Sequence, residues 1–203
     1  MVVAGVGLVI AAPLMLGIAI FVRLTSPGPI LYRQVRVGRD QRVAGVPAGN
    51  HRRVLDHGGK PFTIYKFRTM AASASRRSEQ VWATPNDERI TPLGRLLRRF
   101  RLDELPQLIN VLRGDMNIVG PRPEQPNIFA DLRSQVPNYQ ERQRVRPGIT
   151  GWAQINHHYD RSIDDVRKKV TYDLEYIARQ SFAEDLKVML RTGPVLFFKM
   201  GSW

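Results

Sequence analysis

An uncharged, apolar segment at the N-terminus constrains this chain more than any other feature. Residues 2–22 (VVAGVGLVIAAPLMLGIAIFV) contain no charged side chain. As an α-helix, this segment would be about 32 Å long, which matches the hydrocarbon core of a bilayer. No basic residue precedes it, as a secretory signal peptide would require, and buried core helices are usually shorter and more amphipathic. We therefore predict a membrane segment.

Pro13 lies near the middle of this segment. Proline removes a backbone hydrogen bond and clashes with the preceding helical turn, so we expect the helix to kink or break there. Two half-helices that meet at a bend can enter and leave the bilayer by the same face, but ordinary transmembrane helices also tolerate proline. The residues alone therefore leave both a re-entrant and a spanning helix open.

The composition is that of a globular protein with a strong basic excess. The chain has 203 residues, and its 31 Lys and Arg against 18 Asp and Glu give a net charge of +13. The absence of cysteine excludes disulfides, thiolate metal sites and a cysteine nucleophile. Most of the basic residues are arginines, which bind phosphate through paired hydrogen bonds. The charge favours an anionic partner but leaves open nucleic acid, an anionic membrane or a phosphorylated small molecule.

The residue pattern beyond the membrane segment predicts a small, mainly helical α+β domain with a short β element. Apolar and polar residues alternate over 61–70 (PFTIYKFRTM), as in a strand that presents Lys66 and Arg68 on one face. An arginine-rich stretch interrupted by glycine and proline at 39–59 predicts a mobile basic loop. Apolar residues at helical spacing predict helices at 92–100 (capped by Thr91), 103–112 (ended by Gly114), 164–180 and 182–198 (broken at Gly193-Pro194).

The candidate chemistry gathers around two adjacent carboxylates, Asp103 and Glu104, at the start of a predicted helix. Such a pair most often caps its helix, but a helix N-terminus also attracts phosphate, and a divalent cation held by the carboxylates can share that site. Two turns rich in glycine and proline carry arginines: GPRP at 120–123, with Arg122, and RVRPGITG at 144–151, with Arg146. Together these features predict a site for a phosphoanhydride.

Four longer motifs carry a resemblance to a known family. The segments are RLDELPQLINVLRGDMNIVGPRPE (101–124), RVRPGITGWAQIN (144–156), PFTIYKFRTM (61–70) and SPGPILYRQVRVG (26–38). They resemble the bacterial sugar transferase family, the monotopic polyprenyl-phosphate phosphoglycosyl transferases. The resemblance implies transfer of a sugar phosphate from a UDP-sugar to undecaprenyl phosphate, with release of UMP. It also implies that this reaction is the first membrane step of exopolysaccharide or other surface-glycan synthesis.

The same resemblance assigns roles to individual residues. Asp103 is expected to be the nucleophile that forms a phospho-sugar-aspartate intermediate in a ping-pong mechanism, and Glu104 is expected to organise the site. Mg²⁺ bound at Asp103 and Glu104 is expected to neutralise the diphosphate. The residues expected to bind nucleotide or phosphate are Lys66, Arg68, Arg122, Arg146, Pro147, Gly148 and Asp173.

The resemblance also predicts how the chain is arranged at the membrane. Residues 1–29 are expected to form a re-entrant helix and turn, bent where family members have a Ser-Pro pair and this chain has Ala12-Pro13. The missing serine hydroxyl leaves the freed backbone with one hydrogen bond fewer. Residues 30–203 are expected to form a cytosolic catalytic domain with interfacial amphipathic helices. The protein would then lie on the cytoplasmic face of the bacterial inner membrane.

The expected partners are a UDP-sugar donor, undecaprenyl phosphate and anionic membrane lipids, with no nucleic acid. The alternative is a membrane-tethered basic binding module without catalysis. A nucleic-acid module would need aromatic residues interleaved with arginines on a sheet, or a helix-turn-helix, and the sequence has neither. The sequence leaves open the sugar and the pathway, and also a homodimer. It equally leaves open whether the chain is a minimal member of the family or the catalytic part of a longer protein.

Overall fold

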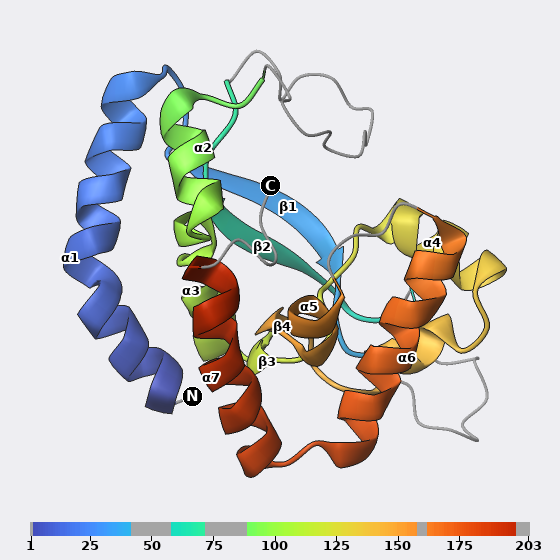
Figure 1. Cartoon of the computed structure of the whole chain (residues 1–203). Helices are drawn as coiled ribbons and strands as arrows, with labels where there is room; N and C mark the ends of the chain where they lie inside the picture. Colours follow the sequence, from blue (N-terminus) through green and yellow to red (C-terminus); the bar gives the residue numbers. More distant parts are fainter. Residues whose placement is uncertain (1, 42–57, 72–88, 158–161, 198–203) are drawn as a thin grey trace.

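A computed structural model describes residues 2–41, 58–71, 89–157 and 162–197 (Figure 1). Its helices surround two small sheets, in agreement with the predicted α+β class. In chain order the elements are α1 (Val2–Thr25), β1 (Leu31–Val37), β2 (Pro61–Phe67), α2 (Pro92–Arg99), the 3-10 turn η3 (Leu102–Glu104), α3 (Gln107–Leu112), β3 (Asn117–Val119), α4 (Pro126–Gln135), the 3-10 helix η4 (Tyr139–Arg144), β4 (Gly148–Thr150), α5 (Trp152–Asn156), α6 (Ile163–Arg179) and α7 (Phe182–Phe197).

The apolar N-terminal segment forms α1, which lies along the outside of the domain beside α2 and α3 (Figure 1). The helix is not broken at Pro13; it continues through this residue and bends along its length. One side is buried at Ala4, Ile18 and Val22, whereas the large apolar side chains on the other side are exposed. Within the described part of the chain, α1 is the helix long and apolar enough to cross a membrane.

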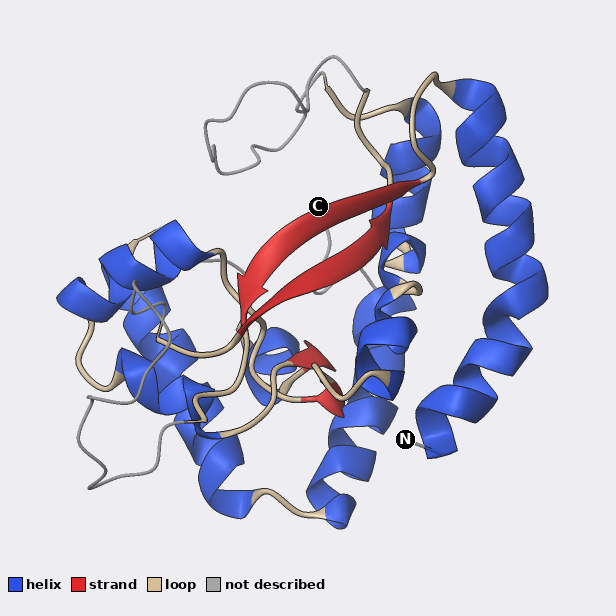
Figure 2. Ribbon diagram, turned by 180° about the vertical axis from the view of Figure 1, so that it is seen from behind, coloured by secondary structure: helices blue, strands red, loops and turns tan. Residues whose placement is uncertain are grey.

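The longer of the two sheets pairs β1 and β2 antiparallel, from Leu31 opposite Phe67 to Val37 opposite Pro61 (Figure 2). The strand predicted at 61–70 therefore exists but ends three residues early, because Arg68 turns toward the end of α1. Of the basic loop predicted at 39–59, residues 42–57 lie outside the described part of the chain.

The second sheet is a short parallel pair, β3 and β4, and glycines allow it to form. A Cβ added to Gly148 would lie 2.1 Å from the backbone nitrogen of Gly120, and one added to Gly151 would lie 2.3 Å from the Gly120 carbonyl oxygen. Only glycine permits such close backbone contact. This packing brings together the two arginine-bearing turns that the sequence singled out.

The helices predicted from the sequence are present in the structure, but not all of their boundaries agree. Thr91 caps α2 as predicted, because its Oγ1 accepts the N–H of Gly94 at 2.9 Å. The helix predicted at 103–112 starts later than expected: η3 comes first, and α3 begins only at Gln107. Gly114 follows α3 with a φ of 78°, the left-handed backbone expected beyond a helix end.

The predicted break at Gly193-Pro194 in the last helix is wrong, since α7 runs through both residues to Phe197. Pro194 lies close to the end of the helix, and the missing N–H removes a single intrahelical bond. Gly193 has no atom within 4 Å of an added Cβ, so the backbone there has room to adjust. The helix predicted at 164–180 matches α6 to within one residue.

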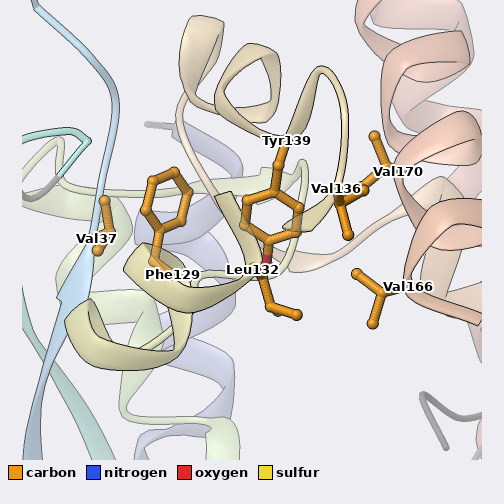
Figure 3. Close-up of a cluster of buried hydrophobic side chains, with 7 residues drawn as sticks. All are labelled: Val37, Phe129, Leu132, Val136, Tyr139, Val166 and Val170. Carbon is orange, nitrogen blue, oxygen red and sulfur yellow. The ribbon is translucent and has the colours of Figure 1, made fainter. Parts of the chain in front are cut away.

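A compact apolar cluster fixes α4, η4 and α6 against the end of β1 (Figure 3). The rings of Phe129 and Tyr139 lie 5.2 Å apart, tilted by 55°, at its centre. The cluster consists of Val37, Phe129, Leu132, Val136, Tyr139, Val166 and Val170. Its burial gives the adjacent buried polar groups a rigid support.

Candidate active site

Asp103 and Glu104 lie on η3, the short turn between α2 and α3. Only 7% of Asp103 and 5% of Glu104 is exposed, although both carry carboxylates. Arg101, at the start of this turn, adopts a left-handed backbone with a φ of 52°, which is unusual for a residue other than glycine. Charge burial and backbone strain thus occur together at these carboxylates, as they do at many functional sites.

Three basic side chains surround Glu104, and we call them the cationic cage: Lys66, Arg101 and Arg122. Lys66 Nζ donates to Glu104 Oε1 at 2.7 Å, and Arg122 Nη2 donates to the same oxygen at 2.8 Å. Arg101 Nη1 lies 3.9 Å from Glu104 Oε2. Burial alone would raise the pKa of Glu104, but the charges of Arg122 and Lys66 outweigh it and hold this pKa well below its usual range. Glu104 is therefore an ionised structural centre of the site.

Asp103 has a different environment. Among the described residues, its carboxylate has no hydrogen bond and no ion pair. Burial raises the pKa of Asp103, and the adjacent charge of Glu104 raises it further; Lys66, Arg98 and Arg122 oppose this shift. A carboxylate without a partner, near several cations, is free to act as a nucleophile toward an anionic phosphoryl group.

Arg142 stabilises the turn that carries Arg122. This side chain is completely buried, and its Nη2 donates to the Arg122 carbonyl oxygen at 3.1 Å. Its Nε donates to Asp173 Oδ2 at 2.7 Å, and its Nη1 donates to Tyr139 Oη at 2.8 Å. Asp173, expected at the nucleotide, thus lies in a buried ion pair that reaches the site through Arg142.

The structure brings together some of the predicted site residues and separates others. Lys66, Asp103, Glu104 and Arg122 form one group. Arg68 lies elsewhere: its Nη2 donates to the Val22 carbonyl and to both Ser26 oxygens, at the end of α1. Arg146 is exposed, whereas Pro147 and Gly148 are buried in the backbone contact with the other turn.

Several residues of the site gave no clear signal in the sequence. Arg101 directly precedes the 3-10 turn η3, and Arg142 lies in the 3-10 helix η4; in neither place does a helical or strand period mark which side chains face inward. Gln154 Oε1 accepts from both Arg101 and Arg122, at 3.4 Å each. A polar residue inside the otherwise apolar stretch WAQI was the one available clue to Gln154.

The magnesium ion expected at Asp103 and Glu104 stays a prediction, and only the number of carboxylates bears on it. No group of three or more His, Cys, Asp or Glu side chains suited to a metal was found among the described residues. Mg²⁺, however, is commonly held by one or two carboxylates together with substrate phosphates and water. Asp103 and Glu104 supply that number of carboxylates.

Comparison with known proteins gives consistent matches. A family model for bacterial sugar transferases matches residues 1–199. The chain is 39% identical over 181 residues to the UDP-N-acetylgalactosamine-undecaprenyl-phosphate N-acetylgalactosaminephosphotransferase of Aeromonas hydrophila. It is 40% identical over 187 residues to the UDP-glucose:undecaprenyl-phosphate glucose-1-phosphate transferase of Escherichia coli, and 39% identical over 187 residues to the protein of the same name from Caulobacter vibrioides. These matches cover 89%, 91% and 91% of this chain but 38%, 36% and 63% of the three relatives.

Proposed function

Because the chain belongs to the bacterial sugar transferase family, we propose that it transfers a sugar 1-phosphate from a UDP-sugar to undecaprenyl phosphate. The relatives named for this reaction support the proposal, and they differ in the sugar, N-acetylgalactosamine in one and glucose in others. The observation that carries it is the buried Asp103 carboxylate, which has no partner among the described residues and lies beside an ionised, firmly held Glu104.

In the first half of the proposed reaction, an oxygen of Asp103 attacks the phosphorus atom that bears the sugar. The bond from this phosphorus to the bridging oxygen breaks, and UMP leaves with that oxygen and its electron pair. In the second half, a phosphate oxygen of undecaprenyl phosphate attacks the same phosphorus. The acyl-phosphate bond breaks, the lipid diphosphate sugar forms, and the Asp103 carboxylate is restored.

The cationic cage supplies the electrostatic part of this mechanism. A carboxylate and a diphosphate repel each other, and in a site of low dielectric this repulsion is strong. The three cations of the cage exceed the two negative charges of Glu104 and ionised Asp103, so the site keeps an excess of positive charge for the phosphates. Mg²⁺ held by Asp103, Glu104 and the diphosphate would add to this neutralisation.

The proposed location is the cytoplasmic side of a bacterial plasma membrane. The exposed apolar side of α1 supports membrane attachment, and the curvature of α1 along its length is compatible with a re-entrant helix. A lipid acceptor and a soluble donor can then use the same site one after the other. Anionic lipids would attract the basic surface of the domain.

The test is UMP release by the purified full chain in detergent, with undecaprenyl phosphate and a panel of UDP-sugars. We expect release with at least one UDP-sugar, and loss of release when a chelator removes divalent metal. Absence of UMP release with every UDP-sugar would contradict the proposed function. Undiminished release in excess chelator would show that the reaction does not need Mg²⁺, and it would not contradict the transfer reaction itself.

A further inference from the structure

Gln154 lies on α5, whose start is tied to the turn that carries Arg122. The Gly120 N–H donates to the Thr150 carbonyl at 2.9 Å, and the backbones of Gly120 and Gly151 are in direct contact. Arg122 follows two residues after the first of these glycines, and Gln154 follows three residues after the second. The two side chains therefore start from backbone positions that are fixed relative to each other.

The side-chain oxygen of Gln154 lies between two arginines of the cationic cage. Its Oε1 accepts from Arg122 Nη1 and from Arg101 Nη1, at 3.4 Å each. Both arginines also face Glu104: Arg122 Nη2 lies 2.8 Å from Glu104 Oε1, and Arg101 Nη1 lies 3.9 Å from Glu104 Oε2. Gln154 is thus a second acceptor for the same two guanidinium groups that Glu104 holds.

The orientation of the Gln154 amide follows from this contact. Its Nε2 is buried and has no hydrogen-bond partner within the described ranges. A reversed amide would direct its N–H groups at two positively charged guanidinium groups, which is electrostatically unfavourable. The oxygen therefore faces the arginines even though a buried donor is left unpaired.

The neutrality of Gln154 matters for the charge of the site. A carboxylate at this position would hold the two arginines more strongly, but it would also cancel one of the positive charges that the cage offers to the diphosphate. An amide holds them while leaving that charge in place. An apolar residue of similar length would keep the charge but would not orient the guanidinium groups.

We propose that Gln154 is a positioning residue that orients Arg101 and Arg122 toward the donor diphosphate without neutralising them. It acts through the two arginines and does not touch the reacting atoms. The inference rests on the proposed function, because it takes a nucleoside diphosphate as the ligand of the site.

The test uses the purified full chain with Gln154→Glu and Gln154→Met, and Gln135→Glu on the exposed end of α4 as the matched control. For each protein, KM and kcat are measured by UMP release, and UDP affinity is measured by calorimetry. Gln154→Glu should raise KM for the UDP-sugar and Kd for UDP by about tenfold, with a smaller change in kcat. Gln154→Met should lower kcat by about tenfold with little change in KM, because the charge remains but its orientation is lost.

Gln135→Glu should match the wild type in all three quantities. A thermal unfolding temperature within a few degrees of the wild-type value identifies the variants that are folded. One folded Gln154 variant is enough to test the positioning role of Gln154. UDP affinity unchanged by Gln154→Glu, or kcat unchanged by Gln154→Met, would overturn the proposal. If the wild type binds UDP but releases no UMP, the proposed function fails, whereas the UDP affinities of the variants still test the inference.

Discussion

At the scale of single residues, two neighbouring carboxylates have opposite electrostatic environments. Glu104 receives Lys66 and Arg122 within hydrogen-bond distance, whereas Asp103 has no direct partner among the described residues. The pKa of Glu104 is lowered and that of Asp103 is raised. Such a division allows one acid to organise cations while the other stays available for covalent chemistry.

The raised pKa of Asp103 predicts the pH at which the acid limb of the pH–rate profile lies. The proposed nucleophile, Asp103, must be ionised to attack, so the acid limb of kcat/KM should lie above the ordinary aspartic acid pKa of about 3.9. Lys66→Met should move the limb to higher pH, because Lys66 favours the ionised form of Asp103 and its loss raises that pKa further. The measurement is UMP release between pH 4 and pH 8.

Lys168→Met is the control for this prediction, since Lys168 is exposed on α6. It should leave the acid limb where it lies in the wild type. A limb that stays in place or moves to lower pH in Lys66→Met would show that Lys66 does not act on the nucleophile.

At the scale of elements, the parallel pair β3–β4 assembles the site by bringing together two turns that are distant in the sequence. Gly148→Ala should destabilise the protein by about 2–3 kcal/mol, because the new Cβ would lie 2.1 Å from the Gly120 nitrogen and would force the strands apart. Activity should fall as well, since Arg122 follows this contact in the chain. Thermal unfolding and UMP release measure the two effects.

Gly193→Ala is the matched control, because nothing lies within 4 Å of an added Cβ at this helical position. Alanine in a helix interior should leave stability unchanged or raise it by about 0.5–1 kcal/mol. Equal stability of the Gly148 and Gly193 variants would contradict the close backbone contact.

The topology of α1 can be tested with single cysteines, because the natural chain has none. If α1 is re-entrant, Val2→Cys and Ser202→Cys should both be protected from a membrane-impermeant maleimide in intact cells and labelled after permeabilisation. If α1 spans the membrane, exactly one of the two should be labelled in intact cells. The bend of α1 motivates the first expectation, and labelling of one cysteine alone would contradict it.

The elements also indicate which parts of the fold the sequence could predict. Local signals identified the apolar helix, the strand at 61–70 and the Thr91 cap, because period and capping act within a few residues. The pairing of Arg142 with Asp173 has no such signal, since it depends on how η4 packs on α6. The late start of α3 was missed for the same reason: the turn before it is held by tertiary contacts of its charged side chains.

At the scale of the whole molecule, a second buried ion network joins the sheet, the Arg122 turn and α6. Glu124 Oε1 accepts from Lys169 Nζ at 2.8 Å, and Glu124 Oε2 lies 3.8 Å from Arg36 Nη1. Burial would raise the pKa of Glu124, but the charges of Lys169, Arg142 and Arg36 lower it to about 2. The stability that this network contributes is fully present above the ordinary pKa of 4.5 and is lost as the pH falls toward 2.

Glu124→Gln should therefore destabilise the protein at pH 7 by about 3 kcal/mol and flatten the loss of stability between pH 5 and pH 2. Glu141→Gln is the control, because its exposed pair with Arg144, at 3.6 Å, should contribute less than about 1 kcal/mol. Unfolding in urea at several pH values measures both. A wild-type acid dependence in Glu124→Gln would contradict the network.

The central proposal at this scale is that Asp103 forms a covalent intermediate with the sugar phosphate. The most direct measurement is the half-reaction with a UDP-sugar labelled in the phosphate next to the sugar, in the absence of undecaprenyl phosphate. We predict about one UMP released per active chain, with the label bound to the protein, and neither in Asp103→Asn. If a preparation active with both substrates releases no UMP until undecaprenyl phosphate is added, the reaction does not pass through a covalent Asp103 intermediate.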